Sequence, residues 1–169
     1  MFTVEYLKPS EHASAMTKEN KASMTIYYRA ATIEDFPAIV VFFEEELQRS
    51  ANRTYIREAL LNYPAGLAFD EDELIGFIYC GYMAPDVLEL ANIVIAEKYR
   101  SQGIGTELLK YTEKLIAVQA KAILLTNSSL YGNNKGKRNA ENFYLSNGYT
   151  QINLTGETNL YWKNLADLR

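Results

Sequence analysis

The sequence has little of the chemistry on which many enzymes rely. Cys80 is the only cysteine and His12 the only histidine among 169 residues. A disulfide framework, a zinc site of cysteine and histidine, a Ser-His-Asp triad and a Cys-His dyad are therefore excluded. Because Cys80 lies in the apolar run "ELIGFIYCGYM", we interpret its thiol as part of the core. Proton transfer must then use carboxylates, tyrosines, lysines or water, and no metal is expected.

The sequence also lacks a large excess of one charge sign and lacks long apolar segments. The chain has 17 basic and 21 acidic residues, and its net charge of -4 gives no broad positive field for a nucleic acid or an anionic membrane. No segment reaches the roughly 18 apolar residues of a membrane-spanning helix, and the first residues lack the apolar core of a signal peptide. We therefore expect a soluble, cytoplasmic protein that binds neither nucleic acid nor membrane.

Apolar periodicity begins near Met24, and a chain of this length suits a single hydrophobic core. We predict an N-terminal extension over residues 1–23 and a single domain over residues 24–169.

The pattern along that domain predicts strands and helices in alternation. Thr32 and Asp35, three residues apart, are typical of a helix start, and Pro64 followed by Gly66 is typical of a helix end. Strands are expected near 24–32, 65–70, 73–83, 87–96, 121–128, 149–154 and 159–165, and helices near 32–49, 53–63, 104–116 and just before Gly148. The run at 121–128 is nearly all apolar, as in a buried parallel strand. The order β, α, α, β, β, β, α, β, α, β, β predicts an α/β (α+β) fold with a mixed sheet.

A glycine-rich turn, "YRSQGIG", stands between a strand and a long helix. Gly103 and Gly105 let backbone N–H groups converge, and a helix that starts there directs its unpaired donors and positive end into the turn. This arrangement is typical of a diphosphate site, to which Arg100 adds a charged donor. On the glycines alone, a connection that binds nothing is an equal alternative.

Two other phosphate-binding patterns fit poorly. The G-x-x-x-x-G-K-[ST] loop requires a lysine and a hydroxyl that "SQGIGTELL" lacks, and in "GNNKGKR" Arg138 stands where Ser or Thr is required. A dinucleotide site requires a third glycine where this chain has Leu108. A nucleotide-binding protein and an oxidoreductase are therefore disfavoured.

The turn and its surroundings resemble the GNAT superfamily of N-acetyltransferases. "YRSQGIG" fits the R/Q-x-x-G-x-G/A loop of that family through Arg100, Gly103 and Gly105, and "NAENFYLSNGYT" is similar to its A-x-x-x-Y-x-x-x-G-[FY] segment through Tyr144. The resemblance extends over about residues 25–163. It implies a GNAT-like mixed central sheet of about six to seven strands flanked by about four helices, with acetyl-CoA as co-substrate and N-acetyltransferase activity.

The resemblance also implies where acetyl-CoA binds. In this family it lies in a V-shaped opening between two central parallel strands, with its pantetheine arm along the free strand edge before the loop and its diphosphate on backbone N–H groups. Many members have an asparagine seven residues before the tyrosine, where this chain has Lys137, and Asn139 is the nearby substitute. The implied cofactor-binding residues are Ile93, Val94, Ile95, Arg100, Ser101, Gln102, Gly103, Ile104, Gly105, Thr106, Asn139 and Tyr144.

Acetyl transfer to an amine requires a base, because an alkyl ammonium has a pKa of about 10.4. Strand alternation is expected to place Glu89, Ala91 and Ile93 on one face, near the thioester. Glu89 is therefore our candidate base, and a solvated or ion-paired strand carboxylate is the alternative.

The reaction also requires a polarised carbonyl and a proton for the departing thiolate. A backbone N–H near Val94 or Ile95 could bind the thioester oxygen. By resemblance, Tyr144 is the general acid, and a buried aromatic residue without a catalytic role is the alternative.

The acceptor is the least defined part of the prediction. The family builds its acceptor site largely from the first two helices, where this chain has Glu44, Glu45, Glu46 and the exposed-looking Arg49, Arg53 and Arg57. Such acidic runs are more often a solvated helix face than an amine site. We expect direct transfer in a ternary complex to a small-molecule or peptide amine, and homodimer formation is left open. The alternative is a module that binds acyl-CoA without turnover and regulates a partner.

Overall fold

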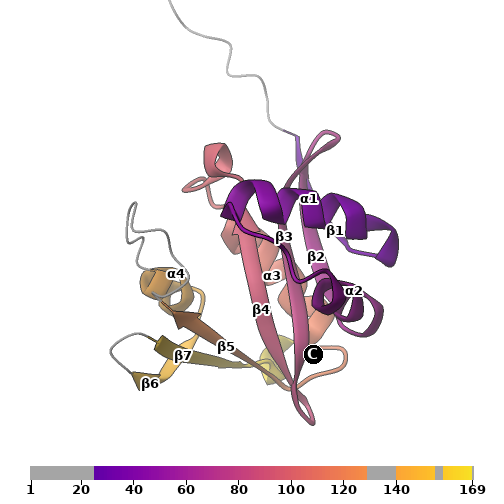
Figure 1. Ribbon diagram of the computed structural model, residues 1–169. Coiled ribbons are helices and arrows are strands. Elements are labelled where there is room, and N and C mark those ends of the chain that lie inside the picture. The colour runs from indigo at the N-terminus through magenta and orange to yellow at the C-terminus, as the bar shows by residue number, and fades with distance from the viewer. Residues whose placement is uncertain (1–24, 129–139, 155–157, 169) are drawn as a thin grey trace, which may run out of the picture.

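The computed structural model describes residues 25–128, 140–154 and 158–168 (Figure 1). The seven strands found in these residues form one sheet of order β1-β2-β3-β4-β5-β7-β6, in which only β4 and β5 are parallel neighbours. The strands are β1 (Ile26–Ala30), β2 (Ala65–Asp70), β3 (Glu73–Ala84), β4 (Val87–Ile95), β5 (Ala122–Ser128), β6 (Thr150–Leu154) and β7 (Thr158–Asn164). The α-helices are α1 (Phe36–Leu47), α2 (Arg53–Asn62), α3 (Ile104–Ile116) and α4 (Ala140–Ser146). The predicted mixed α/β fold and element order are confirmed.

Helices cover both faces of the sheet. α1 and α2 lie on one face, over β2, β3 and β4, and α3 lies on the opposite face (Figure 1). We call these two sides the α1/α2 face and the α3/α4 face. Each face has its own hydrophobic core. The first core includes Phe43, Ile56, Phe77, Tyr79 and Val94, and the second includes Ile78, Leu108, Ile116, Ile123, Leu125, Tyr144 and Tyr161. Membership in one core or the other therefore shows to which side a strand residue points.

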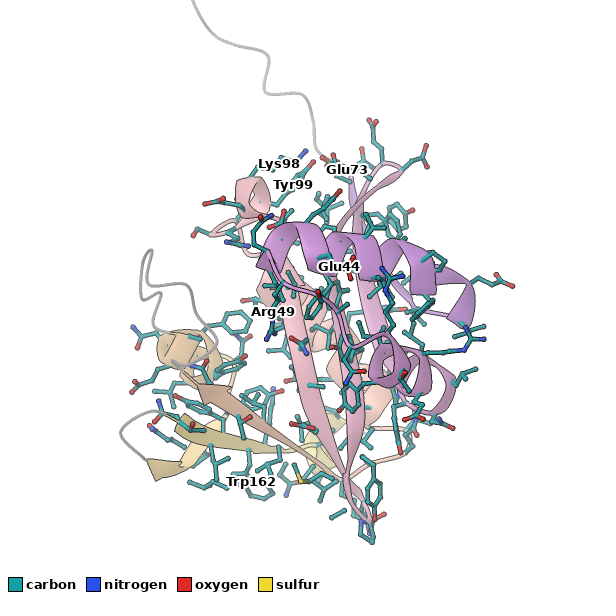
Figure 2. All side chains as sticks on the ribbon, viewed as in Figure 1. Glu44, Arg49, Glu73, Lys98, Tyr99 and Trp162 are labelled. Atoms are coloured by element: carbon teal, nitrogen blue, oxygen red, sulfur yellow. The ribbon has the colours of Figure 1, made fainter. Side chains whose placement is uncertain are left out.

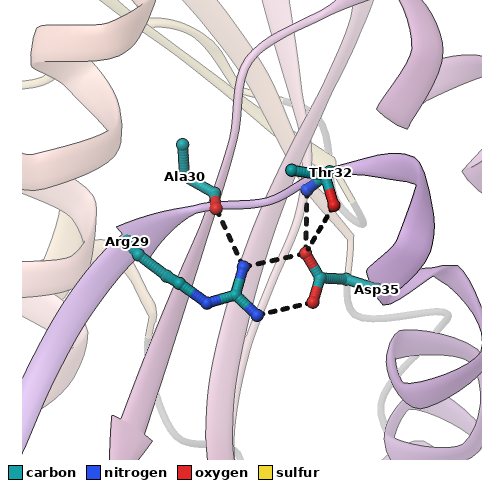
Figure 3. Close-up of polar contacts among 4 residues, drawn as sticks. All are labelled: Arg29, Ala30, Thr32 and Asp35. Atoms are coloured by element: carbon teal, nitrogen blue, oxygen red, sulfur yellow. Dashed lines mark hydrogen bonds and ion pairs between the residues drawn. The ribbon is translucent and has the colours of Figure 1, made fainter.

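Thr32 and Asp35 start the first helical segment, as their spacing predicts. A 3-10 turn over Ile33–Asp35 leads into α1. The Asp35 carboxylate accepts the Thr32 N–H at 2.8 Å and two guanidinium N–H groups of Arg29, at 2.6 and 2.9 Å (Figure 3). The hydrogen bond from Arg29 lowers the pKa of Asp35. This contact fixes α1 against β1 and so against the sheet.

Gly66 has a different role from the predicted one. Helix α2 ends at Asn62, and Pro64 follows it, but Gly66 lies inside β2. A Cβ at Gly66 would overlap the Thr112 Oγ1 of α3. The prediction that Gly66 helps to end the helix is therefore wrong, because this glycine allows α3 to pack closely on the sheet.

A β-bulge interrupts the alternation of β4. Tyr79 of β3 lies opposite Asn92 and Cys80 lies opposite Leu90, so Ala91 has no residue opposite it on β3. From this point on, the side chains of β4 are shifted by one position relative to a regular strand.

The bulge corrects the predicted face of three residues. Glu89 points to the α1/α2 face, where it contacts Tyr55 of α2, and Ala91 packs on the same side. Ile93 packs against the α3/α4 core instead. The prediction that Glu89, Ala91 and Ile93 share one face is wrong, because it assumed a regular strand.

Candidate active site

The two parallel strands at the centre of the sheet separate part of the way along. β4 and β5 make three residue pairs, the last of which is Glu89–Leu124. Beyond this pair β4 continues to Ile95 and β5 to Ser128 without pairing with each other. Figure 1 shows the two strands diverging. The result is a V-shaped opening with its apex at Glu89 and Leu124.

Successive residues of β4 direct their peptide groups alternately toward β3 and toward the opening. The Ala96 N–H donates to β3 at 2.9 Å, and Val94, two residues earlier, has the same orientation. Ile93 and Ile95 therefore direct their peptide groups into the opening, where the Ile95 carbonyl accepts from Arg100 Nε at 2.7 Å. Of the three predicted edge residues, Ile93 and Ile95 border the opening, and Val94 is turned away from it.

The glycine turn lies at the wide end of the opening and begins α3. Ser101 and Gly103 have left-handed backbones, with φ of 60° and 84°, and glycine adopts this conformation without a Cβ penalty. The first N–H groups of α3 have no partner inside the helix, and the positive end of the helix dipole lies there. The Arg100 N–H already donates to Glu97 O at 3.2 Å. The main-chain N–H of Arg100, one of the predicted cofactor-binding residues, is therefore already engaged within the turn.

The Arg100 side chain anchors the turn to α1. Its Nη2 atom lies 3.0 Å from Glu46 Oε2, and the same oxygen accepts the Glu97 N–H at 3.1 Å. Sequence reasoning treated Glu46 only as part of an acidic run. The structure gives it a positioning role, because it holds both ends of the 3-10 turn that precedes the glycines.

Glu44, in the same run, is also engaged. Its carboxylate accepts the Ala51 N–H at 3.2 Å and lies 3.3 Å from Arg53 Nη2. These contacts join the end of α1 to the start of α2. Glu44 and Glu46 thus stabilise the local structure, a role that was not predicted from the sequence.

Tyr99 and Lys98 hold the other side of the turn (Figure 2). The Tyr99 hydroxyl lies 2.9 Å from Asp70 Oδ2 and 3.3 Å from Glu73 Oε2, and Lys98 Nζ lies 2.7 Å from Glu73 Oε1. Asp70 and Glu73 belong to the β2–β3 hairpin. The entry to the glycine turn is thereby fixed to the hairpin on one side and to α1 on the other.

A cleft of about 440 Å³ occupies the opening. Among the predicted cofactor residues that the structure describes, Val94, Gln102 and Ile104 do not line it. Ile104 is buried in the α3/α4 core, and Gln102 donates through its side chain to Lys98 O at 2.9 Å. Asn139 lies outside the described residues. The lining residues are Ile93, Ile95, Arg100, Ser101, Gly103, Gly105, Thr106, Asn127, Ala140, Phe143 and Tyr144.

Asn127 and Phe143 were missed from the sequence, and Ala140 was noted there only as the first position of the A-x-x-x-Y segment. Phe143 forms a wall of the cleft opposite Gly105 and Ile95. It directly precedes Tyr144, and the spacing of the tyrosine motif says nothing about the residue before it. Asn127 lines the cleft from β5, and only the divergence of β4 and β5 exposes it there.

Tyr144 reaches the cleft from the α3/α4 face. Its ring packs against Phe143, Tyr149 and Tyr161, with centroid distances of 5.3, 5.7 and 5.2 Å. Only 7% of the residue is exposed. Burial, with a smaller contribution from Tyr161, raises the pKa of Tyr144 to about 12. The phenol therefore keeps its proton near neutral pH and can donate it.

Glu89 lies at the apex of the opening on the opposite face. Its Oε2 atom accepts from the Tyr55 hydroxyl at 3.4 Å. Burial and, to a smaller extent, the Glu89 charge raise the pKa of Tyr55. No ion pair of Glu89 is found among the described residues. Tyr144 thus lines the cleft, whereas Glu89 is not among the lining residues and lies at the apex, on the other face of the sheet.

Two further polar groups lie on the Glu89 side. Asn92 Nδ2 donates to the Tyr79 hydroxyl at 2.8 Å, and burial raises the pKa of Tyr79 to about 12. Burial also raises the pKa of Cys80 to about 12, in keeping with a thiol that belongs to the core. Tyr55, Tyr79 and Asn92 were not predicted, because the bulge that brings Asn92 beside Tyr79 leaves no mark in the sequence.

The cleft has the chemistry required by a diphosphate joined to an extended amide chain. Unpaired N–H donors lie at its wide end, a strand edge runs along one side, and Phe143 gives an apolar wall. A Cβ at Gly105 would lie 3.5 Å from Ile95 Cγ1 and 3.6 Å from Phe143 Cε2. Any longer side chain at Gly105 would fill the space between the loop and that wall, so the residues present fit a coenzyme A.

The fold and the cleft together fit a protein of the acetyltransferase class. A sequence model described as an acetyltransferase (GNAT) domain matches residues 63–151, which is more than half of the chain. The chain therefore belongs to the GNAT acetyltransferase family. No curated protein matches it.

Solved structures with the same fold include N-acetyltransferases at low sequence identity. The PaiA N-acetyltransferase of Thermoplasma acidophilum, in complex with coenzyme A, is 20% identical with a TM-score of 0.67, over 83% of this chain and 99% of that one. The ribosomal-protein-S18-alanine N-acetyltransferase of Escherichia coli is 14% identical with a TM-score of 0.68, over 83% and 94%. Naa50 of Arabidopsis thaliana, in complex with the bisubstrate analogue CoA-Ac-MVNAL, is 17% identical with a TM-score of 0.65, over 82% and 98%. At these sequence identities, the similarity to the three structures shows a shared fold.

Among the described residues, no helix is both long and apolar enough to cross a bilayer.

Proposed function

We propose that this protein is an acetyl-CoA-dependent N-acetyltransferase that transfers an acetyl group to a primary amine by direct transfer in a ternary complex. The observation that carries the proposal is the divergence of β4 and β5, with the start of α3 at the wide end and Glu89 at the apex. Membership in the GNAT acetyltransferase family supports it. So do the structural neighbours solved with coenzyme A or a coenzyme A conjugate.

The donor would be held by backbone more than by side chains. N–H groups from Ser101 to Thr106 would bind the diphosphate, and Ile93 and Ile95 would pair with the amides of the pantetheine arm. From Ile95 to Glu89 the strand advances by six residues, or about 20 Å at about 3.3 Å per residue. This length brings the thioester end of an extended arm to the region of the bulge and Glu89.

Acetyl-CoA supplies the thioester carbon that the amine attacks and the thiolate that leaves. Glu89 would take the proton of the incoming ammonium, directly or through a water molecule. Ala91, which has no residue opposite it on β3, would offer its N–H to the thioester oxygen as negative charge develops. This residue lies closer to Glu89 than the predicted donors Val94 and Ile95, and the Val94 peptide group faces β3.

Tyr144 would return a proton on the other side of the opening. Its raised pKa keeps the phenol protonated, and its position in the wall of the cleft makes the hydroxyl available to the leaving sulfur. The acceptor enters from the α1/α2 face and the donor from the α3/α4 face. This geometry favours a ternary complex over a covalent acetyl-enzyme, and buried Cys80 offers no exposed nucleophile.

The proposal also includes residues 24–169 as one acetyltransferase domain, a cytoplasmic location, and a small-molecule or peptide amine as acceptor. Homodimer formation stays open, as it was in the sequence analysis.

Thermal unfolding with added ligands tests the donor first. Acetyl-CoA at millimolar concentration should raise the melting temperature, whereas ATP and NADH should not. An unchanged melting temperature with acetyl-CoA would contradict the proposal.

A thiol-release screen across polyamines, amino acids, aminoglycosides and peptides then tests turnover. Initial velocities should give intersecting patterns when both substrates are varied. Binding of acetyl-CoA without turnover of any amine would favour the alternative, a module that holds acyl-CoA to regulate a partner.

A further inference from the structure

One row of residues crosses the sheet at the apex of the opening. The cross-strand pairs Gly81–Glu89, Glu89–Leu124, Leu124–Trp162 and Thr150–Trp162 join β3, β4, β5, β7 and β6 in register. Side chains in one such row point to the same face of a sheet. Leu124 and Trp162 therefore share the face of Glu89.

Alternation along β5 and β7 gives the same result. Ile123, Leu125 and Tyr161 belong to the α3/α4 core. Leu124 lies between the first two and Trp162 follows the third, so both point to the α1/α2 face. On this side α1 and α2 lie over β2 to β4, and Trp162 lies apart from them, at β7 (Figure 2). Trp162 is 38% exposed, although indole side chains are usually buried to a greater extent.

The row places an apolar surface beside the candidate base. Neighbouring strands are about 4.8 Å apart, so Leu124 is about 4.8 Å and Trp162 about 9.6 Å from Glu89 along the row. On the β3 side the same row ends at Gly81, where a Cβ would overlap the Tyr55 hydroxyl that contacts Glu89. The positions beside Glu89 in the row, on the side away from α2, are therefore those of Leu124 and Trp162.

We propose that Leu124 and Trp162 form the acceptor subsite, which selects a primary amine attached to an apolar aliphatic or aromatic group. This inference rests on the proposed function, because it places the reacting nitrogen at Glu89. The apolar group lies on the indole and the leucine side chain, about one to two strand spacings from the nitrogen. A compact polar amine would contact Glu89 alone.

A matched pair of amines tests the selectivity. Hexylamine and 2-(2-aminoethoxy)ethanol have nearly equal lengths and one primary amine each, and differ in the polarity of the chain. Thiol release should give a kcat/KM at least about tenfold higher for hexylamine than for 2-(2-aminoethoxy)ethanol.

Variants of Trp162 test whether the indole causes this ratio of kcat/KM values. Trp162→Ala should raise the KM for hexylamine and so reduce the ratio to near unity, whereas Trp162→Phe should retain most of it. Val118→Ala, at a residue 85% exposed, serves as the control for loss of an exposed apolar side chain and should leave the ratio unchanged. Equal rates for the two amines in the unmodified protein, or a ratio unaffected by Trp162→Ala, would overturn the assignment.

Fluorescence gives a reading that does not require turnover. Trp162 is the only tryptophan in the chain, so its emission reports the subsite directly. In the presence of coenzyme A, hexylamine should change the emission saturably, and 2-(2-aminoethoxy)ethanol should not. If no amine supports thiol release, the proposed function fails, and the titration still decides whether apolar amines bind at Trp162. An emission that changes with protein concentration and not with amine would place a second copy of the chain on this face and would overturn the inference.

Discussion

Replacing Tyr144 with phenylalanine removes one oxygen atom from the wall of the cleft and leaves the packing of the ring intact. The aromatic contacts with Phe143, Tyr149 and Tyr161 do not involve the hydroxyl. No hydrogen bond from the Tyr144 hydroxyl to another described residue is found. The unfolding free energy should therefore change by no more than about 0.5 kcal/mol.

The effect on catalysis should be much larger. With a pKa of about 12, the phenol is protonated at pH 8 in all but about one molecule in 10⁴, so it is in the donating form throughout a normal assay. A positioned general acid contributes about 10²–10⁴-fold, which is about 2.7–5.4 kcal/mol at about 1.36 kcal/mol per tenfold. We expect Tyr144→Phe to lower kcat by such a factor and to leave the Kd for acetyl-CoA within about threefold.

Tyr161→Phe is the matched control, because it deletes the same atom from a neighbouring ring. The Tyr161 hydroxyl is buried and has no hydrogen-bond partner among the described residues. Its removal should change kcat by less than about twofold. Thiol release at saturating acetyl-CoA measures both variants. Full activity of Tyr144→Phe, or an equal loss in both variants, would refute the assignment of Tyr144 as the proton donor.

Three further predictions concern stability. Lys163→Ala should lower the unfolding free energy by about 3–5 kcal/mol in urea unfolding, because Lys163 Nζ lies 2.7 Å from Glu113 Oε2 and the Glu113 side chain is only 2% exposed. A loss below about 1 kcal/mol would show that the Glu113 carboxylate is not buried against Lys163. Gly103→Ala should cost about 1–2 kcal/mol in the same assay, although no atom lies within 4 Å of the added Cβ, because φ is 84°; unchanged stability would contradict the left-handed backbone. Burial raises the pKa of both Tyr79 and Tyr144 from 10.0 to about 12, so the stability linked to their neutral hydroxyls is complete below pH 10 and is lost as the pH rises toward 12, by up to about 2.7 kcal/mol each. Urea unfolding between pH 9 and 11.5 should show this decline, and a flat profile would count against both burials.

Most of the fold follows from local patterns that the sequence displays directly. The spacing of Thr32 and Asp35 predicts the helix start, and the apolar run at 121–128 predicts a parallel strand. Each of these depends on neighbouring residues alone. The family likewise follows from a motif in which Gly103 has to adopt a positive φ at a helix start.

The errors concern features that depend on contacts between distant segments. The bulge at Ala91 arises from the pairing of β4 with β3, so the alternation of β4 alone placed Ile93 on the wrong face. The role of Gly66 depends on Thr112, which lies in another element and packs against it only in the folded chain.

Calorimetric titration of acetyl-CoA into the unmodified protein and into Gly105→Leu tests the central claim most directly. The unmodified protein should bind one acetyl-CoA per chain. The leucine side chain would fill the space between the glycine turn, Ile95 and Phe143, so the variant should bind at least about a hundredfold more weakly while unfolding at a similar temperature. Absence of binding to the unmodified protein, or equal affinity in a folded Gly105→Leu variant, would contradict the assignment of this cleft to the acetyl donor.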